Sequence, residues 1–303
     1  MLQRRTLQAI INGQRRYVSQ TPSRSTISTS EIVGETVTLE GANQMKEARI
    51  GAVKTSGQSR RFYKKVGITP LETGGGTQYM VTLDSRIVKT PMSKRLLLPT
   101  KQLASLVAFE WDCQQTQIIP SSMPMMTLST TATDVLPEKK NMIIDNILNH
   151  VQTDIICIRI PESPEQVGLP ERQAELYDPL NHWFSEFMKT KGLQLNTGIW
   201  MQKQDEDLMR KIQWNLFAWD DHTLSALDSL VTSLRSFVLA LALWQKHIDV
   251  DFAIMAVNVE EDYRLSEDLI VPGYHDIRDA NLRASIDAAL LYLHLIPPAQ
   301  LIH

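Results

Sequence analysis

Cysteine is scarce in this sequence, since Cys113 and Cys157 are the only two among 303 residues. Two cysteines are too few for a disulfide framework or a thiolate metal site, and this scarcity is typical of a reducing compartment. Long hydrophobic runs are missing as well. The longest uninterrupted apolar run extends from Phe237 to Trp244, far short of the roughly 20 residues that span a bilayer. We therefore expect no membrane insertion.

An excess of positive charge is the next absence. The chain has 31 Lys and Arg against 34 Asp and Glu, which gives a formal net charge of −3. Basic residues are mixed with acidic ones along most of the sequence, so a positive face for a phosphate backbone is not expected. This excludes nucleic acid as a partner. With 43% apolar residues, the chain is long enough to bury a large core and to form two domains.

Recognisable catalytic and metal-binding motifs are missing too. None of the seven histidines is spaced i, i+3 or i, i+4 from another, as two ligands of one metal on a helix would be. Gly74-Gly75-Gly76 is not followed by the residues of a phosphate-binding loop, and no Gly-x-Ser-x-Gly elbow occurs. Neighbouring acids, as in Glu260-Glu261-Asp262, point apart on a helix, which suits a solvated or partner-binding face better than an acid–base pair. The sequence thus indicates no metal, no cofactor and no enzymatic activity.

The first thirty residues have a composition of their own. Residues 1–30 contain five arginines and no lysine or acid, and their second half is rich in Ser and Thr. This composition is typical of a mitochondrial transit peptide. The run Arg15-Arg16-Tyr17-Val18 resembles a matrix-peptidase site and predicts a mature chain that begins near Val18. Removal of residues 1–30 would take five positive charges from a chain of net charge −3 and leave −8.

The pattern of residues 31–135 indicates a lead-in and then a β-rich domain. Residues 31–59 have no clear period and predict a flexible lead-in. In residues 60–135, short β-rich runs are separated by the turn residues Gly74-Gly75-Gly76 and Asp84-Ser85, which predicts a β-meander. A helix capped by Thr100 follows, and a second helix begins at Met123-Pro124. The expected strands are Phe62–Val66, Tyr79–Leu83, Arg86–Thr90 and Lys94–Leu98.

Helical periodicity dominates residues 136–303. Asp178-Pro179 has the form of an N-cap followed by proline at the first helical position. Asp154–Ile160 and Leu193–Trp200 have the composition of strands. The fold class that we expect is α+β, with a small β-rich N-terminal domain followed by a larger all-helical C-terminal domain. The other expected helices are Glu138–Asn149, Asp205–Trp219, Thr223–His247, Asp251–Asp262 and Asp276–Leu295.

Several short segments are informative because of their order along the chain. They are Arg61–Val66, Val81–Arg86, Lys89-Thr90-Pro91, Leu98-Pro99-Thr100, Glu110-Trp111-Asp112, Ile119-Pro120, Met123-Pro124, Thr153-Asp154 and Asp178-Pro179-Leu180. Together they resemble the mitochondrial F1-ATPase assembly chaperone family that binds the F1 α subunit, the assembly factor 2 type. Beyond residue 184 the likeness lies mainly in the helical pattern and in Glu260-Glu261-Asp262-Tyr263 and His275-Asp276.

This resemblance implies a chaperone of the mitochondrial matrix that works without nucleotide or any other cofactor. Such a protein binds the unassembled F1 α subunit, prevents its aggregation and releases it on assembly with the β subunit. It is expected to be a monomer when free. The resemblance makes Glu260 and Glu261 the candidate client-binding residues. It also implies a structural motif that consists of Trp111, Asp112, Pro124, Asp178 and Pro179.

Two alternatives stay open at this point. A matrix enzyme could assemble its site from distant residues such as Cys113, His182 and Glu110, which requires a pocket where these groups meet. A structural subunit of a stable matrix complex would instead co-purify with the mature assembly, from which a chaperone would be absent.

Overall fold

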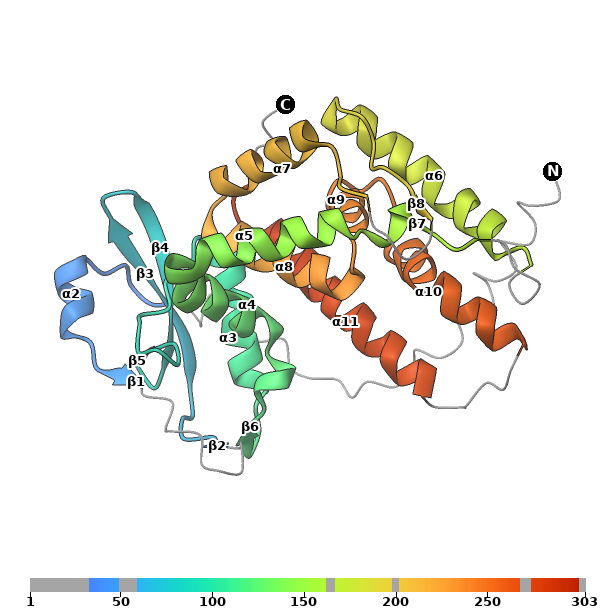
Figure 1. Ribbon diagram of the computed structural model, residues 1–303. Coiled ribbons are helices and arrows are strands. Elements are labelled where there is room, and N and C mark those ends of the chain that lie inside the picture. Colours follow the sequence, from blue (N-terminus) through green and yellow to red (C-terminus); the bar gives the residue numbers. More distant parts are fainter. Residues whose placement is uncertain (1–32, 49–58, 162–166, 198–201, 268–273, 300–303) are drawn as a thin grey trace. The chain divides into compact units, whose positions relative to one another are not determined.

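A computed structural model describes residues 33–48, 59–161, 167–197, 202–267 and 274–299 of the chain (Figure 1). The expected transit peptide, residues 1–30, lies outside these ranges and stays a prediction. The described residues combine a small sheet in the N-terminal half with helices that dominate the C-terminal half. The expected α+β fold class is confirmed.

The sheet is built around the hairpin of β3 (Val66–Thr73) and β4 (Gly76–Leu83). Its register runs from Val66 opposite Leu83 to Thr73 opposite Gly76. The turn contains Gly74 and Gly75, and Gly76 has φ of 120°, a conformation that glycine adopts without strain. β5 (Arg86–Val88) pairs antiparallel with β4, and β1 (Glu47–Ala48) pairs parallel with β5. The hairpin loop expected at the three glycines is confirmed.

The second turn, between β4 and β5, contains no glycine. Asp84 and Ser85 have φ of 48° and 64°, so both central residues are left-handed, as the tightest hairpins require. The Asp84 carboxylate accepts hydrogen bonds from the backbone N–H groups of Lys65, at 2.9 Å, and Lys64, at 3.1 Å. These bonds favour the ionised carboxylate and lower its pKa. Asp84 therefore fastens the turn to the segment before β3.

The described part of the lead-in is structured, which differs from the expected flexible segment. Val33 and Val37 form parallel bridges to Ile68 and Leu71 along the outer edge of β3. The short helix α2 (Leu39–Gln44) follows, and Ala42 is buried against the sheet. The reason is that β3 offers unpaired backbone groups at its edge, and residues 33–37 satisfy them.

The strand expected at Phe62–Val66 is wrong, because β3 begins only at Val66. Residues before it form β2 (Ser59–Arg60), which pairs antiparallel with β6 (Gln117–Ile118). The expected strand Lys94–Leu98 is reduced to isolated bridges, one of them between Leu98 and Tyr79.

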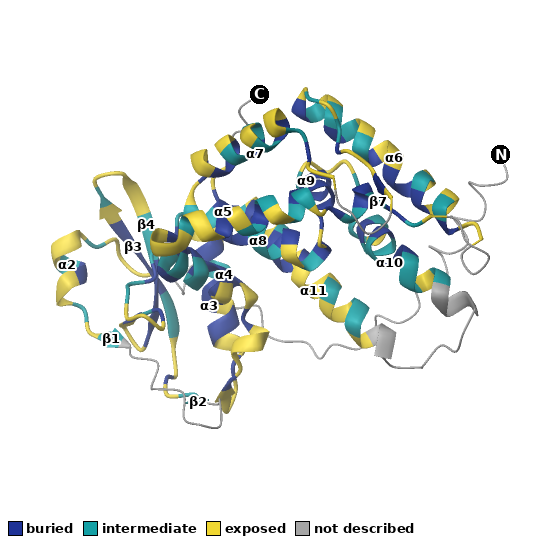
Figure 2. Cartoon of the chain, in the orientation of Figure 1, coloured by how far each residue is buried: buried dark blue, intermediate teal, exposed yellow. Residues whose placement is uncertain are grey.

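Helix α3 (Lys101–Cys113) lies on the sheet and contacts β3 and β4. The Thr100 side chain accepts a hydrogen bond from the N–H of Leu103 at 3.2 Å, which confirms the expected cap. Leu103, Val107 and Trp111 form the buried stripe, as the four-residue spacing predicts. Burial along this face is visible in Figure 2.

A helical stretch that is kinked at Lys139 leads from the β-rich part into the helical part. It consists of α4 (Pro124–Thr130), the π-helix η3 (Thr131–Val135) and α5 (Leu136–Gln152). Asp134 of the π-helix is buried and accepts hydrogen bonds from the Thr90 hydroxyl at 2.7 Å and from the Met92 N–H at 3.1 Å. The domain boundary expected between residues 135 and 136 falls inside this stretch and stays a prediction.

The described residues of the C-terminal part form six further helices: α6 (Leu169–Met188), α7 (Glu206–Ala218), α8 (Asp221–Leu234), α9 (Phe237–Trp244), α10 (Val250–Glu267) and α11 (Tyr274–Leu295). Helix α8 contacts α5, α9 and α11, and α9 is buried on nearly every side (Figure 2). One exception to the helical pattern is the short parallel pair of β7 (Ile158–Arg159) and β8 (Asn196–Thr197).

Three local expectations in this part are wrong. The single helix Thr223–His247 is two helices, because Arg235 adopts a left-handed φ of 53° and the Ser236 hydroxyl caps α9 through the Leu239 N–H at 3.0 Å. The strand Asp154–Ile160 is mostly a 3₁₀ turn, η4 (Ile155–Cys157), ahead of β7. Asp178-Pro179 is not a helix start, since α6 begins at Leu169 with Pro170 in its first turn.

Candidate functional site

Glu110 and Pro124 together start helix α4. The buried Glu110 carboxylate accepts hydrogen bonds from the N–H groups of Met125, at 2.7 Å, and Met126, at 2.8 Å. These are amides of the first helical turn, which have no partner within the helix, and Pro124 occupies the position where no N–H is needed. Burial raises the pKa of Glu110 to about 7, against the opposing effect of the two hydrogen bonds.

Trp111 and Asp112 hold the segment that precedes β3. Trp111 is 1% exposed, and its ring meets the Tyr63 ring edge to face with centroids 5.7 Å apart. The Tyr63 hydroxyl donates to the carbonyl of Trp111 at 2.6 Å, and the Arg61 guanidinium donates to the carbonyl of Asp112 at 3.0 Å. The motif of residues 110–112 therefore contacts other parts of the fold, which fits the structural role expected from the resemblance.

Asp178 contacts the end of β7 from the middle of helix α6. Its carboxylate accepts a hydrogen bond from the Arg159 guanidinium at 2.5 Å, and Arg159 itself lies 5.2 Å from the centre of the Tyr177 ring. The Tyr177 hydroxyl in turn donates to the carbonyl of Ala256 in α10 at 2.8 Å. Helix α6 is thus the element that joins β7 to α10.

Glu260 and Glu261 contact two different helices. The Glu260 carboxylate accepts from the side-chain amide of Gln173 in α6 at 3.0 Å, and Glu261 forms an ion pair with Arg278 of α11. Adjacent residues on a helix point about 100° apart, so one acid contacts α6 and the other contacts α11. Both candidate client-binding residues therefore have partners inside the chain, and a role in client contact stays a prediction.

Further contacts hold helix α10 on the same two sides. Toward α6, the Tyr263 hydroxyl donates to the carbonyl of Val167 at 2.7 Å. Toward α11, Asn258 donates to Asp279 at 3.0 Å, while Asp251 forms an ion pair with Arg283. These bonds fix the position of α10 between α6 and α11.

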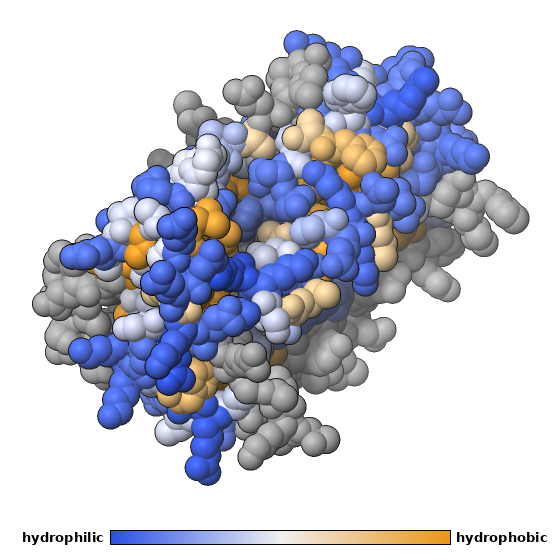
Figure 3. All heavy atoms as spheres, turned by 90° about the vertical axis from the view of Figure 1, so that its left-hand side faces the viewer, coloured by the Kyte–Doolittle hydropathy of each residue, from blue (hydrophilic) through white to orange (hydrophobic). Residues whose placement is uncertain are grey.

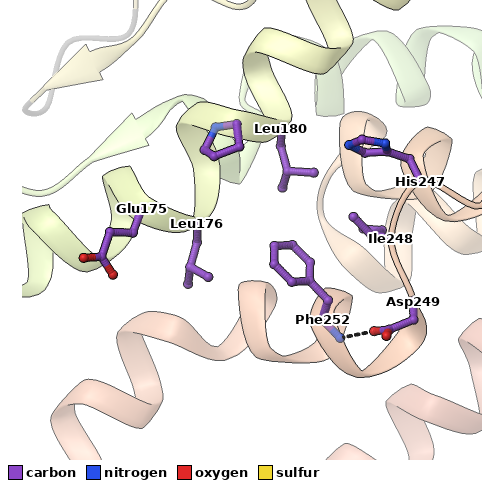
Figure 4. A pocket seen from close by; sticks show the side chains of 8 residues that line it. Glu175, Leu176, Leu180, His247, Ile248, Asp249 and Phe252 are labelled. Carbon is purple, nitrogen blue, oxygen red and sulfur yellow. Dashed lines mark hydrogen bonds between the residues drawn. The ribbon is translucent and has the colours of Figure 1, made fainter. Parts of the chain in front are cut away.

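A groove lies between α6 and the start of α10 (Figure 4). Its volume is about 370 Å³. The lining residues are Glu175, Leu176, Pro179 and Leu180 of α6, His247, Ile248 and Asp249 of the α9–α10 connection, and Phe252 of α10. Pro179 is the one residue of the groove that the resemblance singled out. The rest could not be found from the sequence, because they come from segments about 70 residues apart.

His247, which lines this groove, belongs to an aromatic stack with two residues of α6. The Trp183 ring stacks on the His247 ring with centroids 4.6 Å apart and on the Phe187 ring at 5.1 Å. The stack fixes the α9–α10 connection against α6 and so holds the groove in shape.

Large apolar side chains are exposed at several separate places on the described surface. Trp214 is 68% exposed and Phe109 61% exposed, which is unusual for aromatic residues. Figure 3 shows the face over the sheet, where hydrophobic side chains lie in small groups between hydrophilic ones. The other large apolar residues that are exposed are Leu39, Phe62, Met92, Ile119, Met142, Val167, Leu195, Phe217, Ile277 and Leu291. Such side chains are suited to contacts with another protein.

The three residues of the enzyme alternative have separate surroundings. Cys113 is exposed at the end of α3, Glu110 is buried against α4, and His182 is exposed on α6 beside Glu186 at 3.4 Å. None of them lines the groove between α6 and α10 or another cavity, which lies beside Arg61.

Cys157 is buried rather than reactive. Its Sγ donates to the carbonyl of Asp154 at 3.0 Å and lies 3.6 Å from the Gln204 amide and 3.8 Å from the Asn196 amide. Burial raises the pKa of this thiol to about 11, so it stays protonated.

The described ranges give no sign of a metal centre or a membrane span. Within them, no three His, Cys, Asp or Glu side chains are grouped so that they could hold a metal ion. Every helix in those ranges is too short or too polar to cross a bilayer.

Comparison with known proteins gives consistent matches. The model of the ATP12 chaperone protein family matches residues 60–185. Mitochondrial atp12 of Schizosaccharomyces pombe is 25% identical over 243 residues, which cover 77% of this chain and 81% of the relative. Mitochondrial ATP12 of Saccharomyces cerevisiae is 22% identical over 283 residues and covers 78% and 85%. The crystal structure of Atp12 from Paracoccus denitrificans has a TM-score of 0.69 at 28% identity, covering 79% of this chain and 99% of that one. The family resemblance seen in the sequence is confirmed.

Proposed function

We propose that this chain, which belongs by its residues 60–185 to the ATP12 chaperone family, binds the unassembled F1 α subunit of ATP synthase. It keeps the α subunit from aggregating and releases it when the subunit assembles with β. It acts in the mitochondrial matrix as a monomer when free, uses no nucleotide or other cofactor and catalyses no reaction.

The observation that carries this proposal is the family match, supported along most of the chain by relatives named as mitochondrial proteins. The match covers the residues that hold α3, α4 and α6 in place, so it concerns the framework of the fold. The arginine-rich composition of residues 1–30 supports the mitochondrial destination.

The surface supports a binding role. An unassembled subunit of a ring exposes apolar surface that otherwise leads to self-association. A chaperone needs complementary apolar residues, and exposed side chains such as Trp214, Phe109 and Met142 supply them. Release requires moderate affinity, which separate apolar groups within a polar surface provide better than one continuous patch.

Co-expression tests the proposal directly. The full chain is produced together with the F1 α subunit, and separately with the β subunit, and soluble client and co-elution on a sizing column are measured without nucleotide. We expect the α subunit alone to become soluble and to co-elute with the chain. No effect on α, or an equal effect on both subunits, would contradict the proposal. Stable co-purification with fully assembled F1 would contradict the release step.

A further inference from the structure

The groove between α6 and α10 has an apolar floor and an acidic rim. Leu176, Leu180 and Phe252 face one another across it, and Ile248 closes one end (Figure 4). At the rim, Glu175 is 69% exposed and pairs at 3.4 Å with Arg172 one turn earlier. The Asp249 carboxylate accepts from the N–H of Phe252 at 2.8 Å. The residues that line the groove include two acids and no lysine or arginine.

Pro179 leaves one backbone carbonyl of helix α6 without its usual donor. A proline inside a helix has no N–H to donate to the carbonyl four residues earlier. For Pro179 this carbonyl belongs to Glu175, and both residues line the groove. An incoming N–H or a cationic side chain would satisfy an acceptor that the helix itself leaves without its usual donor.

These features together define the chemistry of an occupant. The floor accepts an apolar side chain, while the carboxylates and the Glu175 carbonyl accept positive charge and N–H donors. We propose that the groove binds a segment of the client in which a large apolar residue lies beside a lysine or arginine. This inference rests on the proposed chaperone function and names the part of the surface that performs it.

Pro179 and Glu175 each allow a variant with a matched control on the same helix. Pro179→Ala restores the missing N–H and satisfies the Glu175 carbonyl without altering charge, whereas Pro170→Ala changes a proline of the first turn, where an N–H has no helical acceptor. Glu175→Arg reverses a charge at the rim. Its control is Glu186→Arg, because Glu186 is 70% exposed but lies outside the groove.

The experiment measures the affinity of each full-length variant for the F1 α subunit and for overlapping peptides of its sequence, with the thermal midpoint as a folding control. We expect Glu175→Arg to weaken binding about tenfold or more, because the new positive charge at the rim repels the lysine or arginine of the bound segment. Pro179→Ala should weaken binding severalfold without lowering the thermal midpoint. The bound peptides should combine an apolar residue with a neighbouring lysine or arginine, and both controls should bind as the wild type does.

Other results would overturn the inference in distinguishable ways. If the wild type binds the α subunit and both groove variants bind equally well, the groove is not the contact and the proposed function still stands. If Glu175→Arg changes the elution of the free chain on a sizing column, the groove joins two copies of this chain instead. If the wild type does not bind the α subunit at all, the proposed function fails and the groove proposal fails with it.

Discussion

Gln173 of helix α6 donates a 3.0 Å hydrogen bond from its side-chain amide to the carboxylate of Glu260 in α10. The oxygen of the same Gln173 side chain accepts from the N–H of Ile160 at 3.0 Å. Gln173 is fully buried, so a single side chain links the end of β7 to the acidic segment of α10. Glu260 therefore has a structural partner in addition to any role toward a client.

Two substitutions of Glu260 separate these roles. Glu260→Lys removes the acceptor and leaves the buried amide of Gln173 unpaired, which we expect to lower the free energy of unfolding by about 1–3 kcal/mol. Glu260→Gln keeps an acceptor oxygen and should change it by less than about 0.5 kcal/mol. Urea unfolding of both variants measures these differences, with Glu186→Lys on exposed α6 surface as the control.

The Glu260→Gln variant then tests the client role without disturbing the fold. If the negative charge contacts the client, this variant should bind the α subunit more weakly at an unchanged thermal midpoint. Full binding by Glu260→Gln together with unfolding of Glu260→Lys would assign Glu260 to structure alone.

Truncation should destabilise the protein strongly at Trp111 and hardly at all at Trp214. Trp111 is 1% exposed, and Trp111→Ala should cost about 3–5 kcal/mol because a large buried side chain is lost and a cavity remains. Trp214 is 68% exposed, so Trp214→Ala should change stability by less than about 0.5 kcal/mol. Chemical unfolding monitored by circular dichroism compares the two. An unchanged stability of Trp111→Ala would contradict the role of this motif in the fold.

The predicted transit peptide can be tested by import. The full chain, offered to isolated mitochondria, should be taken up only while a membrane potential is present and should be shortened to a form beginning near Val18. N-terminal sequencing of the imported protein identifies the new end. Arg15→Ala should leave uptake intact and move or prevent the cleavage. Recovery of an uncut protein, or uptake without a membrane potential, would refute the prediction.

Local sequence signals predict those elements whose stabilising groups are close in the chain. The Thr100 cap and the three-glycine hairpin each place donor and acceptor within a few residues. The start of α6 was missed because Pro179 suggested a helix start, while the actual first turn contains Pro170. A proline fits either position, and only packing decides between them.

Contacts between distant segments could not be predicted from one sequence. The pairing of Arg159 with Asp178 and of Gln173 with Glu260 depends on how α6 lies against its neighbours. The groove depends on the same packing, since it needs Phe252 to face Leu176. The residue types indicated the acidic segment of α10 and the proline at position 179. They did not indicate that helix α6 contacts the acidic segment and also lines the groove.

The break between α8 and α9 gives a further prediction, because Arg235 occupies a left-handed conformation without being glycine. A side chain costs about 1–2 kcal/mol in this conformation. Arg235→Gly should therefore stabilise the protein by about 0.5–1 kcal/mol, the gain being reduced by the greater entropy of glycine in the unfolded chain. Thr232→Gly, on the exposed face of α8, should instead destabilise it by roughly 0.3–0.5 kcal/mol, because glycine has a lower helix propensity than threonine. Thermal unfolding distinguishes the two directions, and a loss of stability in Arg235→Gly would contradict the reason given for the break.

Glu110 should make stability depend on pH, because burial raises its pKa to about 7. The unfolded value is near 4.3, so between these two values the folded state binds a proton that the unfolded state does not. By linkage, the free energy of unfolding then falls as pH rises through this window, by at most about 1.4 kcal/mol per pH unit. Asp154, whose burial raises its pKa to about 6, acts in the same direction. The contribution of Glu110 must therefore be isolated by difference.

Glu110→Gln provides that difference, since the amide does not titrate and the environment of Asp154 is unchanged. The stability advantage of the wild type over this variant should grow as pH is lowered from 8 to about 5 and level off below the unfolded pKa. Urea unfolding at several pH values measures it. A constant difference would mean that the hydrogen bonds from Met125 and Met126 offset the effect of burial and keep Glu110 ionised. A difference that shrinks toward low pH would mean that these bonds outweigh burial, so that the helix cap of α4 works best with a charged carboxylate.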